Sequence, residues 1–223
     1  MARNLCLHCQ RPISACICSF ISKTNNRIPV LVLQHPSEVK QSKGTVALLQ
    51  RSLNICQVLI GENFTENSEL SKILKQHQPI LLYPGESAQE LLKTVNCGSS
   101  VSVENTKAVE VKPLLLVILD GTWKKAYRMF MLSKNLHSLT QVSLPEFLAN
   151  NGRYLIRKVA KKNALSSLEA TCYALALLEG ELDCHLEDDS LLGAEKQIID
   201  CGRYQPLLNN FSQFNLFQLS FRK

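Results

Sequence analysis

The chain has 223 residues, of which 45% are hydrophobic and 20% are charged, and its formal net charge is +6. This composition excludes a disordered chain, and the length suits one ordinary domain with a small appendage rather than two full α/β domains. The moderate positive charge is compatible with a nucleic-acid partner but does not require one.

The chain carries no signature of a membrane or secreted protein. No apolar run reaches the roughly 18 to 20 residues of a membrane helix, and the first residues lack the apolar core of a signal peptide. The nine cysteines form an odd set, four of them within residues 6–18. A secreted disulfide scaffold would be shorter and would spread its cysteines along the chain. We therefore expect a cytoplasmic protein with reduced thiols.

Residues 1–26 form a cysteine-rich segment with no helical or strand period. Its four cysteines, Cys6, Cys9, Cys16 and Cys18, follow the spacing Cys-x2-Cys-x6-Cys-x-Cys. Four thiolates bind zinc tetrahedrally and leave no open position, so such a zinc site is structural. The Cys-x-Cys half is tighter than the usual spacing, and His8 could replace one ligand. The alternative is a loose N-terminus, or cysteines that serve as small core residues.

From residue 27 onward, short apolar runs alternate with helical patterns. The apolar runs predict strands over 29–34, 56–60, 79–83 and 114–119. The segments between and after them predict helices over 46–53, 70–75, 87–93 and 122–133. Continuous apolar strands separated by helices are typical of βαβ units. The sequence therefore predicts an α/β fold with a mostly parallel sheet and helices on both faces.

Three further segments complete the predicted elements. A stretch over 96–109, rich in Ser, Asn and Gly, predicts a surface loop. Residues 166–178 predict a helix with Ser166 or Ser167 as its N-cap, Glu169 in its first turn and Gly180 as its stop. The aromatic-rich tail over 195–221 favours a helix that packs back on the domain.

The segment Asp120-Gly121-Thr122-Trp123 follows the most apolar strand directly. Gly121 allows a sharp turn, and Thr122 can cap the helix that follows. Open α/β sheets bind ligands at the carboxyl ends of their strands, so Asp120 and the chain's single tryptophan lie where a ligand would bind. The alternative is structural: Asp120 would cap the helix and Trp123 would belong to the core.

Basic residues gather in two places after this strand. Lys124, Lys125 and Arg128 come directly after Trp123, and a second cluster lies within residues 153–162. That second cluster consists of Arg153, Arg157, Lys158, Lys161 and Lys162. Both could be solvated faces that keep the protein soluble.

Six landmarks, in this order, make the chain resemble the DTW-domain family. They are the four cysteines, Leu33-Gln34-His35-Pro36-x-Glu38 with Lys43-Gly44-Thr45, Leu82-Tyr83-Pro84, Asp120-Gly121-Thr122-Trp123, Tyr154-Leu155-Ile156-Arg157, and Leu165-Ser166-Ser167-Leu168-Glu169-Ala170. Together they span roughly residues 6 to 179. Ser167 stands where the family more often has threonine, which keeps the hydroxyl. The resemblance divides the chain into a zinc-binding segment, 1–26, and a DTW catalytic domain, 27–223.

The resemblance implies a fold and an activity. The fold is related to SPOUT proteins, with a knot in the C-terminal part of the sheet region. The activity is transfer of the 3-amino-3-carboxypropyl group of S-adenosylmethionine to the imide nitrogen of a uridine in tRNA, which leaves 5′-methylthioadenosine. Two alternatives stay open: a SPOUT-type RNA methyltransferase, and a non-catalytic, zinc-dependent RNA-binding module.

The resemblance also implies roles for individual residues. Asp120 and Trp123 would be catalytic. The cofactor would be bound by Leu82, Tyr83, Asp120, Gly121, Thr122, Ser167 and Glu169, with the N–H groups at the start of a helix facing its carboxylate. Phosphates of the RNA would contact Lys124, Lys125, Arg128, Arg153, Arg157 and Lys158.

Several of these roles have an alternative. Asp120 could act as the base that deprotonates the uridine imide, yet an ordinary aspartate is too acidic for that task. It could instead anchor the cofactor or the uridine. Glu169 could be a capping residue only. His35 and Glu38, before Lys43-Gly44-Thr45, could contact RNA or cofactor, or could form a solvated turn.

Overall fold

The computed structural model describes residues 4–91, 112–150, 165–189 and 194–221. Its centre is a six-stranded sheet in which every neighbouring pair of strands is parallel, in the order β2-β1-β5-β3-β6-β4. The strands are β1 (Val30–Gln34), β2 (Cys56–Ile60), β3 (Gln78–Leu82), β4 (Gln89–Glu90), β5 (Leu114–Asp120) and β6 (Thr140–Ser143). The parallel α/β fold expected from the sequence is confirmed.

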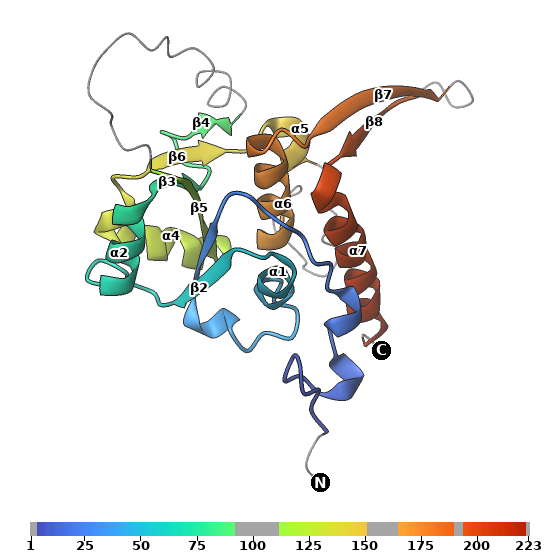
Figure 1. The fold of residues 1–223 in the computed structure, drawn as a ribbon, viewed down its shortest axis with the longest axis horizontal. Helices are drawn as coiled ribbons and strands as arrows, with labels where there is room; N and C mark the ends of the chain where they lie inside the picture. Colours follow the sequence, from blue (N-terminus) through green and yellow to red (C-terminus); the bar gives the residue numbers. More distant parts are fainter. Residues whose placement is uncertain (1–3, 92–111, 151–164, 190–193, 222–223) are drawn as a thin grey trace.

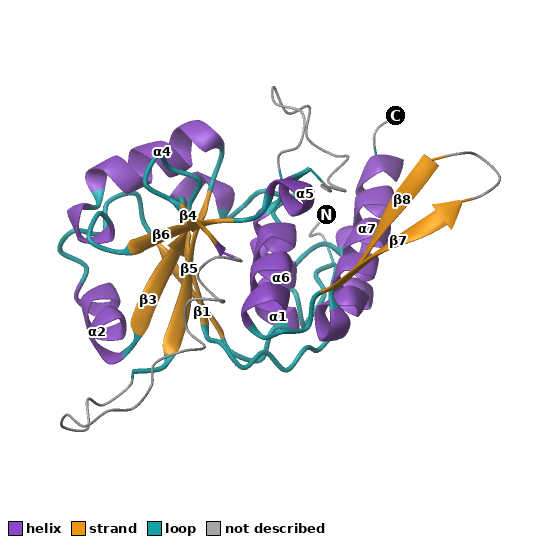
Figure 2. Ribbon diagram, turned by 90° about the horizontal axis from the view of Figure 1, so that it is seen from above, coloured by secondary structure: helices purple, strands orange, loops and turns teal. Residues whose placement is uncertain are grey.

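Helices cover both faces of this sheet. They are α1 (Val46–Ser52), α2 (Ser68–Gln76), α4 (Trp123–Leu132), α5 (Glu146–Ala149), α6 (Ser167–Leu178) and α7 (Gln205–Ser220). Figure 1 and Figure 2 show α2 and α4 on one face, α1 and α6 on the other, and α7 as a further layer outside α6. No described helix is both long enough and apolar enough to cross a membrane.

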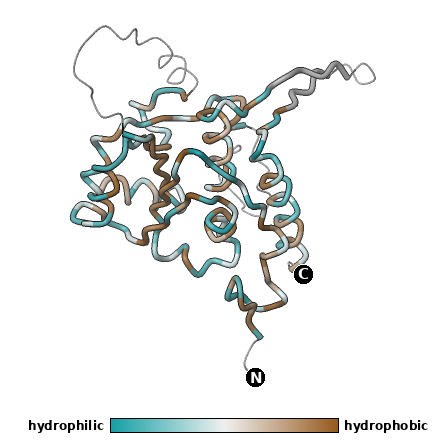
Figure 3. Tube along the Cα trace, in the orientation of Figure 1, coloured by the Kyte–Doolittle hydropathy of each residue, from teal (hydrophilic) through white to brown (hydrophobic). Residues whose placement is uncertain are grey.

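Alternate residues of the central strands feed two separate cores. Val30 and Val32 of β1 point into the core shared with α1, α6 and α7, whereas Leu31 and Leu33 point into the core under α2 and α4. A strand buried on both sides needs apolar residues at every position, which is the reason for its uninterrupted apolar run. The hydrophobic strands in the middle of the molecule are visible in Figure 3.

The N-terminal segment shares a core with the rest of the chain. It contains two short 3-10 helices, η1 (Ile13–Ala15) and η2 (Cys18–Phe20). Ile17 is buried in the core of α1, α6 and α7, and the ring of Phe20 lies 5.7 Å from that of Phe214 and 5.3 Å from that of Phe217, both on α7. The first residues are therefore packed against the last helix.

Two expectations from the sequence are wrong. The helix predicted over 87–93 is wrong for residues 87–90, which are part of a turn followed by β4; residue 91 is helical, and residues 92 and 93 lie outside the described residues. The helix predicted over 195–221 begins only at Gln205, because β8 (Ala194–Asp200) forms an antiparallel hairpin with β7 (Asp183–Asp189). This hairpin projects from the body of the protein (Figure 1).

Three features of the sequence fall outside the described residues. They are the loop expected over 96–109, the landmark Tyr154-Leu155-Ile156-Arg157 and the second basic cluster, with Arg153, Arg157, Lys158, Lys161 and Lys162. The C-terminal knot stays a prediction, because residues 151–164, between α5 and α6, also lie outside the described residues.

Candidate active site

Asp120 is the last residue of β5 and connects three elements. It stands in register with Gln34, the last residue of β1, so the two side chains lie beside each other on the same face of the sheet. The Gln34 amide nitrogen Nε2 donates to Asp120 Oδ2 at 2.9 Å, and the Ser167 hydroxyl of α6 donates to Asp120 Oδ1 at 2.6 Å. Asp120 is only 8% exposed. Both carboxylate oxygens therefore accept hydrogen bonds at the carboxyl edge of the sheet.

The structural alternatives for Asp120 and Trp123 are wrong. The N-cap of α4 is Thr122, whose hydroxyl accepts from the Lys125 N–H at 3.4 Å. Trp123 is the first residue of α4 and is 52% exposed, so it is not a core residue. A Cβ at Gly121 would lie 3.0 Å from Cβ of Lys125, so a side chain at this position would crowd the first turn of α4.

Ser167 and Glu169 have different surroundings at the start of α6. Ser166 is the N-cap: its hydroxyl accepts from the Glu169 N–H at 3.2 Å, while its own N–H donates to Glu169 Oε2 at 2.9 Å. Glu169 is completely buried in this capping box. The capping role considered for Glu169 is confirmed, whereas Ser167 is the residue that contacts Asp120.

Leu82 and Tyr83, at the end of β3, face opposite sides of the sheet. Leu82 packs against the core of α6, on the side to which the Asp120 carboxylate also points. Tyr83 packs under α4, where its ring stacks on that of Phe130 at 4.9 Å. Partial burial, together with the neighbouring Tyr127, raises the pKa of Tyr83. The structure thus brings Asp120 and Ser167 into contact, and it places Tyr83 on the side of α4.

A pocket of about 250 Å³ lies at the carboxyl ends of β1 and β2, and Gln34, the partner of Asp120, is one of its lining residues. Its floor contains Val58 and Ile60 of β2, and its polar lining includes Gln34, Glu38 and Arg11. Gln34 is missing from the site expected from the sequence, although it stands in one of the landmarks and ends a predicted strand. Its contact with Asp120 depends on the order and register of β1 and β5, which the sequence alone does not give.

The cations after Trp123 are not equivalent. Lys125 Nζ lies 2.7 Å from Oε1 of the buried Glu38, and Arg128 Nε lies 2.9 Å from Oε1 of Glu62. Lys124 is exposed to solvent. Of the three predicted phosphate contacts in the described part of the chain, two therefore already have a carboxylate partner.

His35 and Glu38 are parts of an ordered turn at the end of β1. The turn contains η3 (Pro36–Glu38), and the His35 ring accepts from the Ser37 N–H at 3.2 Å through Nδ1. The other ring nitrogen of His35 lies 3.4 Å from Oε1 of Glu62. Since Glu38 is buried and pairs with Lys125, the idea of a merely solvated turn is wrong for Glu38.

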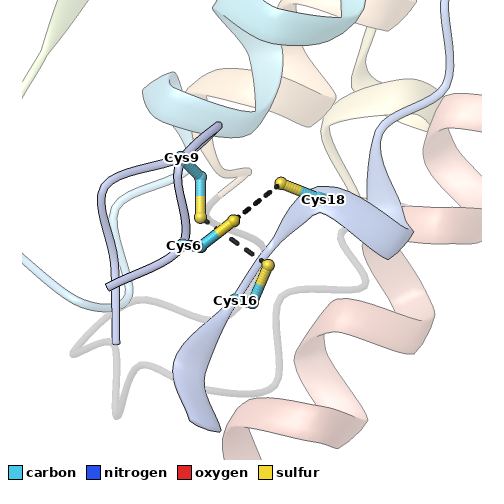
Figure 4. A group of neighbouring side chains, drawn as sticks. All are labelled: Cys6, Cys9, Cys16 and Cys18. Atoms are coloured by element: carbon cyan, nitrogen blue, oxygen red, sulfur yellow. Dashed lines mark hydrogen bonds between the residues drawn. The ribbon is translucent and has the colours of Figure 1, made fainter. Parts of the chain in front are cut away.

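The four N-terminal cysteines come together as a candidate metal centre (Figure 4). Their sulfur atoms all lie within 4.8 Å of one another, with Cys6–Cys18 and Cys9–Cys16 each 3.7 Å apart. Two sulfurs at the usual Zn–S distance and tetrahedral angle are about 3.8 Å apart. The donor set and its spacing therefore fit a tetrahedral ion, and the alternative of a loose N-terminus is wrong.

Local backbone structure shapes this cluster. Gln10 has a φ of 57°, and its N–H donates to the Cys6 carbonyl at 2.9 Å, which closes a tight turn between the first two cysteines. Backbone hydrogen bonds from Cys9 and His8 lower the pKa of Cys6 to about 6, and burial raises the pKa of Cys18 to about 12. The His8 side chain is exposed and is not part of the cluster.

Known proteins resemble this chain over most of its length. It is 32% identical over 184 residues to tRNA-uridine aminocarboxypropyltransferase 2 of Drosophila melanogaster, which covers 79% of this chain and 67% of the fly protein. It is 31% identical to the protein of the same name from Macaca fascicularis, with 79% of this chain and 57% of that protein covered. It is 26% identical over 140 residues to tRNA-uridine aminocarboxypropyltransferase A of Arabidopsis thaliana, with 59% of this chain and 52% of the plant protein covered.

The chain thus spans between about half and two thirds of these relatives. No solved structure matches it. The DTW domain matches residues 3–219, a range that includes the four cysteines, Asp120 and the start of α6. By this match the chain belongs to the DTW-domain family.

Proposed function

We propose that the protein transfers the 3-amino-3-carboxypropyl group of S-adenosylmethionine to the imide nitrogen of a uridine in tRNA, and releases 5′-methylthioadenosine. The observation that carries this proposal is the contact of Asp120 with Gln34 and Ser167 at the carboxyl edge of the sheet. The names of the similar proteins from fly and macaque support it.

The proposed reaction requires selection among three carbons. The sulfonium makes each attached carbon electrophilic, so the site must present the carbon of the aminocarboxypropyl arm in line with the uridine nitrogen. The imide nitrogen loses its proton to solvent water and forms a bond to that carbon, while the carbon–sulfur bond breaks and its electron pair stays on the sulfur of 5′-methylthioadenosine. Selectivity is therefore a matter of orientation, which a rigid sheet edge can supply.

The surroundings of Asp120 support the role of an anchor over that of a base. Both of its oxygens already accept hydrogen bonds, from the Gln34 amide and the Ser167 hydroxyl, so the carboxylate is held in a fixed orientation. Each oxygen keeps a further lone pair, with which the carboxylate can accept from the amino group of the aminocarboxypropyl arm. Gln34 and Ser167 then act as positioning residues, because they fix where that carboxylate points.

The remaining predicted site residues have distinct parts in this proposal. Ser167 and the start of α6 face the cofactor's carboxylate, and Glu169 orients that helix end through the capping box. Leu82 supplies apolar surface on the face of the sheet to which Asp120 points, whereas Tyr83 packs under α4 and Trp123 is the half-exposed first residue of that helix. Gly121 and Thr122 shape the turn through which the backbone approaches the cofactor.

Zinc is the metal that we propose for the four-cysteine cluster. Cys6, Cys9, Cys16 and Cys18 would hold it, and four thiolates leave no position for a substrate. Its role is to fix residues 6–18 against α1 and α7, where Cys9 and Ile17 are buried. The reduced thiols of the described cysteines suit the cytoplasm, in which we place the protein.

The decisive experiment is mass spectrometry of tRNA incubated with the protein and S-adenosylmethionine. The proposal predicts a uridine that gains the aminocarboxypropyl mass, together with 5′-methylthioadenosine. S-adenosylhomocysteine and a methylated nucleotide would indicate the methyltransferase alternative. RNA binding without either by-product would indicate the non-catalytic, zinc-dependent RNA-binding module.

A further inference from the structure

The outer side of α4 exposes a row of large apolar side chains. Trp123, Tyr127 and Met131 are 52%, 58% and 50% exposed. They are four residues apart along the helix, so they lie one above the other on the same side. Large apolar side chains in a row are ordinarily buried in the core. An exposed row of this kind often marks a binding surface.

Further rings extend this row toward β3. The Phe130 ring, also on α4, lies 4.9 Å from that of Tyr83 and 4.7 Å from that of His137. Tyr83 and Phe130 are half-buried and His137 is exposed. At 100° per residue, Phe130 lies on the edge of the exposed row next to Trp123. We call these six side chains, Tyr83, Trp123, Tyr127, Phe130, Met131 and His137, the α4 surface.

Cations border the α4 surface on its other side. Lys124 and Arg128 form a second row along the helix, next to Met131 in angular order. Arg128 is 66% exposed and uses its Nε for Glu62, which leaves further N–H groups on the guanidinium. Lys134, just beyond the end of α4, is also exposed. Rings and positive charges thus run in parallel along one helix.

This combination fits single-stranded nucleic acid better than a second protein. Protein interfaces are also rich in aromatic residues, Met and Arg, but they are depleted in lysine, and Lys124 and Lys134 border this surface. Proteins that bind single strands instead combine aromatic side chains, on which bases stack, with cations that follow the phosphates. The α4 surface begins at Trp123, three residues after Asp120, at the carboxyl edge of the sheet. Because α4 and the Asp120 carboxylate lie on opposite faces of the sheet, an RNA strand bound at both must pass over this edge.

We propose that the α4 surface stacks unpaired bases of the RNA that flank the modified uridine, with Tyr127 as a base-stacking residue. This inference rests on the proposed tRNA substrate and adds a means of recognising it. Stacking is tolerant of base identity, so the surface would favour unstacked loop nucleotides over a duplex rather than select a sequence.

Substitution of Tyr127 tests the stacking directly. Tyr127→Ala should weaken tRNA binding roughly 5- to 100-fold, whereas Tyr127→Phe, which keeps the ring, should bind like the parent protein. The dependence of affinity on salt should keep its slope in Tyr127→Ala, since no phosphate contact is lost. Phe221→Ala, which removes a ring 53% exposed beyond the end of α7 that packs on Phe217, is the matched control and should leave tRNA affinity and its salt dependence unchanged.

The single tryptophan provides a second readout. Trp123 is the only tryptophan of the chain, so fluorescence excited where tyrosine does not absorb reports on the α4 surface. Unpaired tRNA loops should quench this fluorescence, and an RNA duplex of the same composition should quench it less. Equal quenching by both, or an unchanged affinity of Tyr127→Ala, would overturn the proposal.

Self-association is the other outcome to measure. If sedimentation shows a dimer of the parent protein that Tyr127→Ala converts to monomer while tRNA affinity is kept, the surface binds a second copy and the RNA proposal is wrong. Formation of the aminocarboxypropyl product by the parent protein is measured separately, by mass spectrometry of the tRNA. A parent protein that makes the product while Tyr127→Ala binds tRNA normally contradicts only this inference, whereas absence of the product contradicts the proposed function.

Discussion

Gln34 and Asp120 end neighbouring parallel strands in register, and the amide of Gln34 donates to the Asp120 carboxylate across 2.9 Å. The carboxylate of β5 is thereby fixed by a residue 86 positions earlier in the chain. A second donor, Ser167, comes from α6 and holds the other oxygen. Because all three residues lie at the same edge, substitutions in this small network test the proposed mechanism most directly.

Asp120→Asn tests the role of the carboxylate. As an anchor, Asp120 should be needed for cofactor binding, so the variant should bind S-adenosylmethionine roughly 10- to 100-fold more weakly, with a parallel loss of turnover. Calorimetric titration and single-turnover kinetics measure the two effects separately. Asp200→Asn, an exposed aspartate on β8, is the control. Intact cofactor affinity with abolished turnover would instead support the base.

Gln34→Glu should make the protein sensitive to pH. Two carboxylates then face each other where an amide and a carboxylate now bond, and one of them must hold a proton, which raises its pKa in the folded state. A raised folded-state pKa means that stability approaches that of the parent protein in acid and falls as the pH rises through that value.

Thermal unfolding across pH checks this expectation. Gln57→Glu is a matched control, because Gln57 also donates to a carboxylate, Glu69, but on the exposed surface. There solvent screens the repulsion, and the variant should follow the parent protein. Parallel pH profiles for Gln34→Glu and the parent protein would argue that the Gln34–Asp120 contact is unimportant.

Ser167→Ala should remove one of the two bonds to Asp120. A hydrogen bond to a charged group contributes roughly 1.5–3 kcal/mol, so the free energy of unfolding should fall by up to that amount. Ser167→Thr keeps the hydroxyl and should retain both stability and cofactor affinity. Chemical denaturation measures the first effect and calorimetry the second; equal behaviour of the Ala and Thr variants would exclude a role for the hydroxyl.

Local patterns made most of the fold predictable. The strand β5 is apolar from Leu114 to Leu119 because it is buried on both faces, and the spacing of the N-terminal cysteines already suggests a metal cluster. By contrast, β4 and β6 lie at one edge of the sheet and are short and partly polar, so they give no apolar run. The sequence over 194–200 also does not indicate a strand, because β8 forms only by pairing with β7.

The candidate site was predictable in part for a similar reason. Asp120 and Ser167 could be expected from motifs, but their contact, and the participation of Gln34, follows from the strand order β1-β5 and from the position of α6 over β5. Trp123 illustrates a limit of another kind. Hydrophobicity favours a core position, and only the three-dimensional structure shows that the first turn of α4 leaves the indole half exposed.

Removal of the metal should destabilise the N-terminal segment. The protein should contain about one equivalent of zinc, and a chelator should lower Tm, because metal binding and folding are linked. Cys9→Ala should reproduce this loss, whereas Cys56→Ala, at a cysteine outside the cluster, should retain the metal. Elemental analysis of both variants decides the matter, and a full complement of zinc in Cys9→Ala would contradict the proposed ligand set.

Lys124 and Lys125 are neighbours in sequence but should respond differently to substitution. Lys124 is exposed, so Lys124→Ala should weaken tRNA binding and reduce the slope of log affinity against log salt by about one. Lys125 pairs with the buried Glu38 at 2.7 Å. Lys125→Met removes that cation from a buried carboxylate, so it should lower Tm clearly while leaving the salt slope nearly unchanged. Salt titrations and thermal unfolding of both variants distinguish the two roles, and a lowered slope in Lys125→Met would show that Lys125 contacts a phosphate despite its partner.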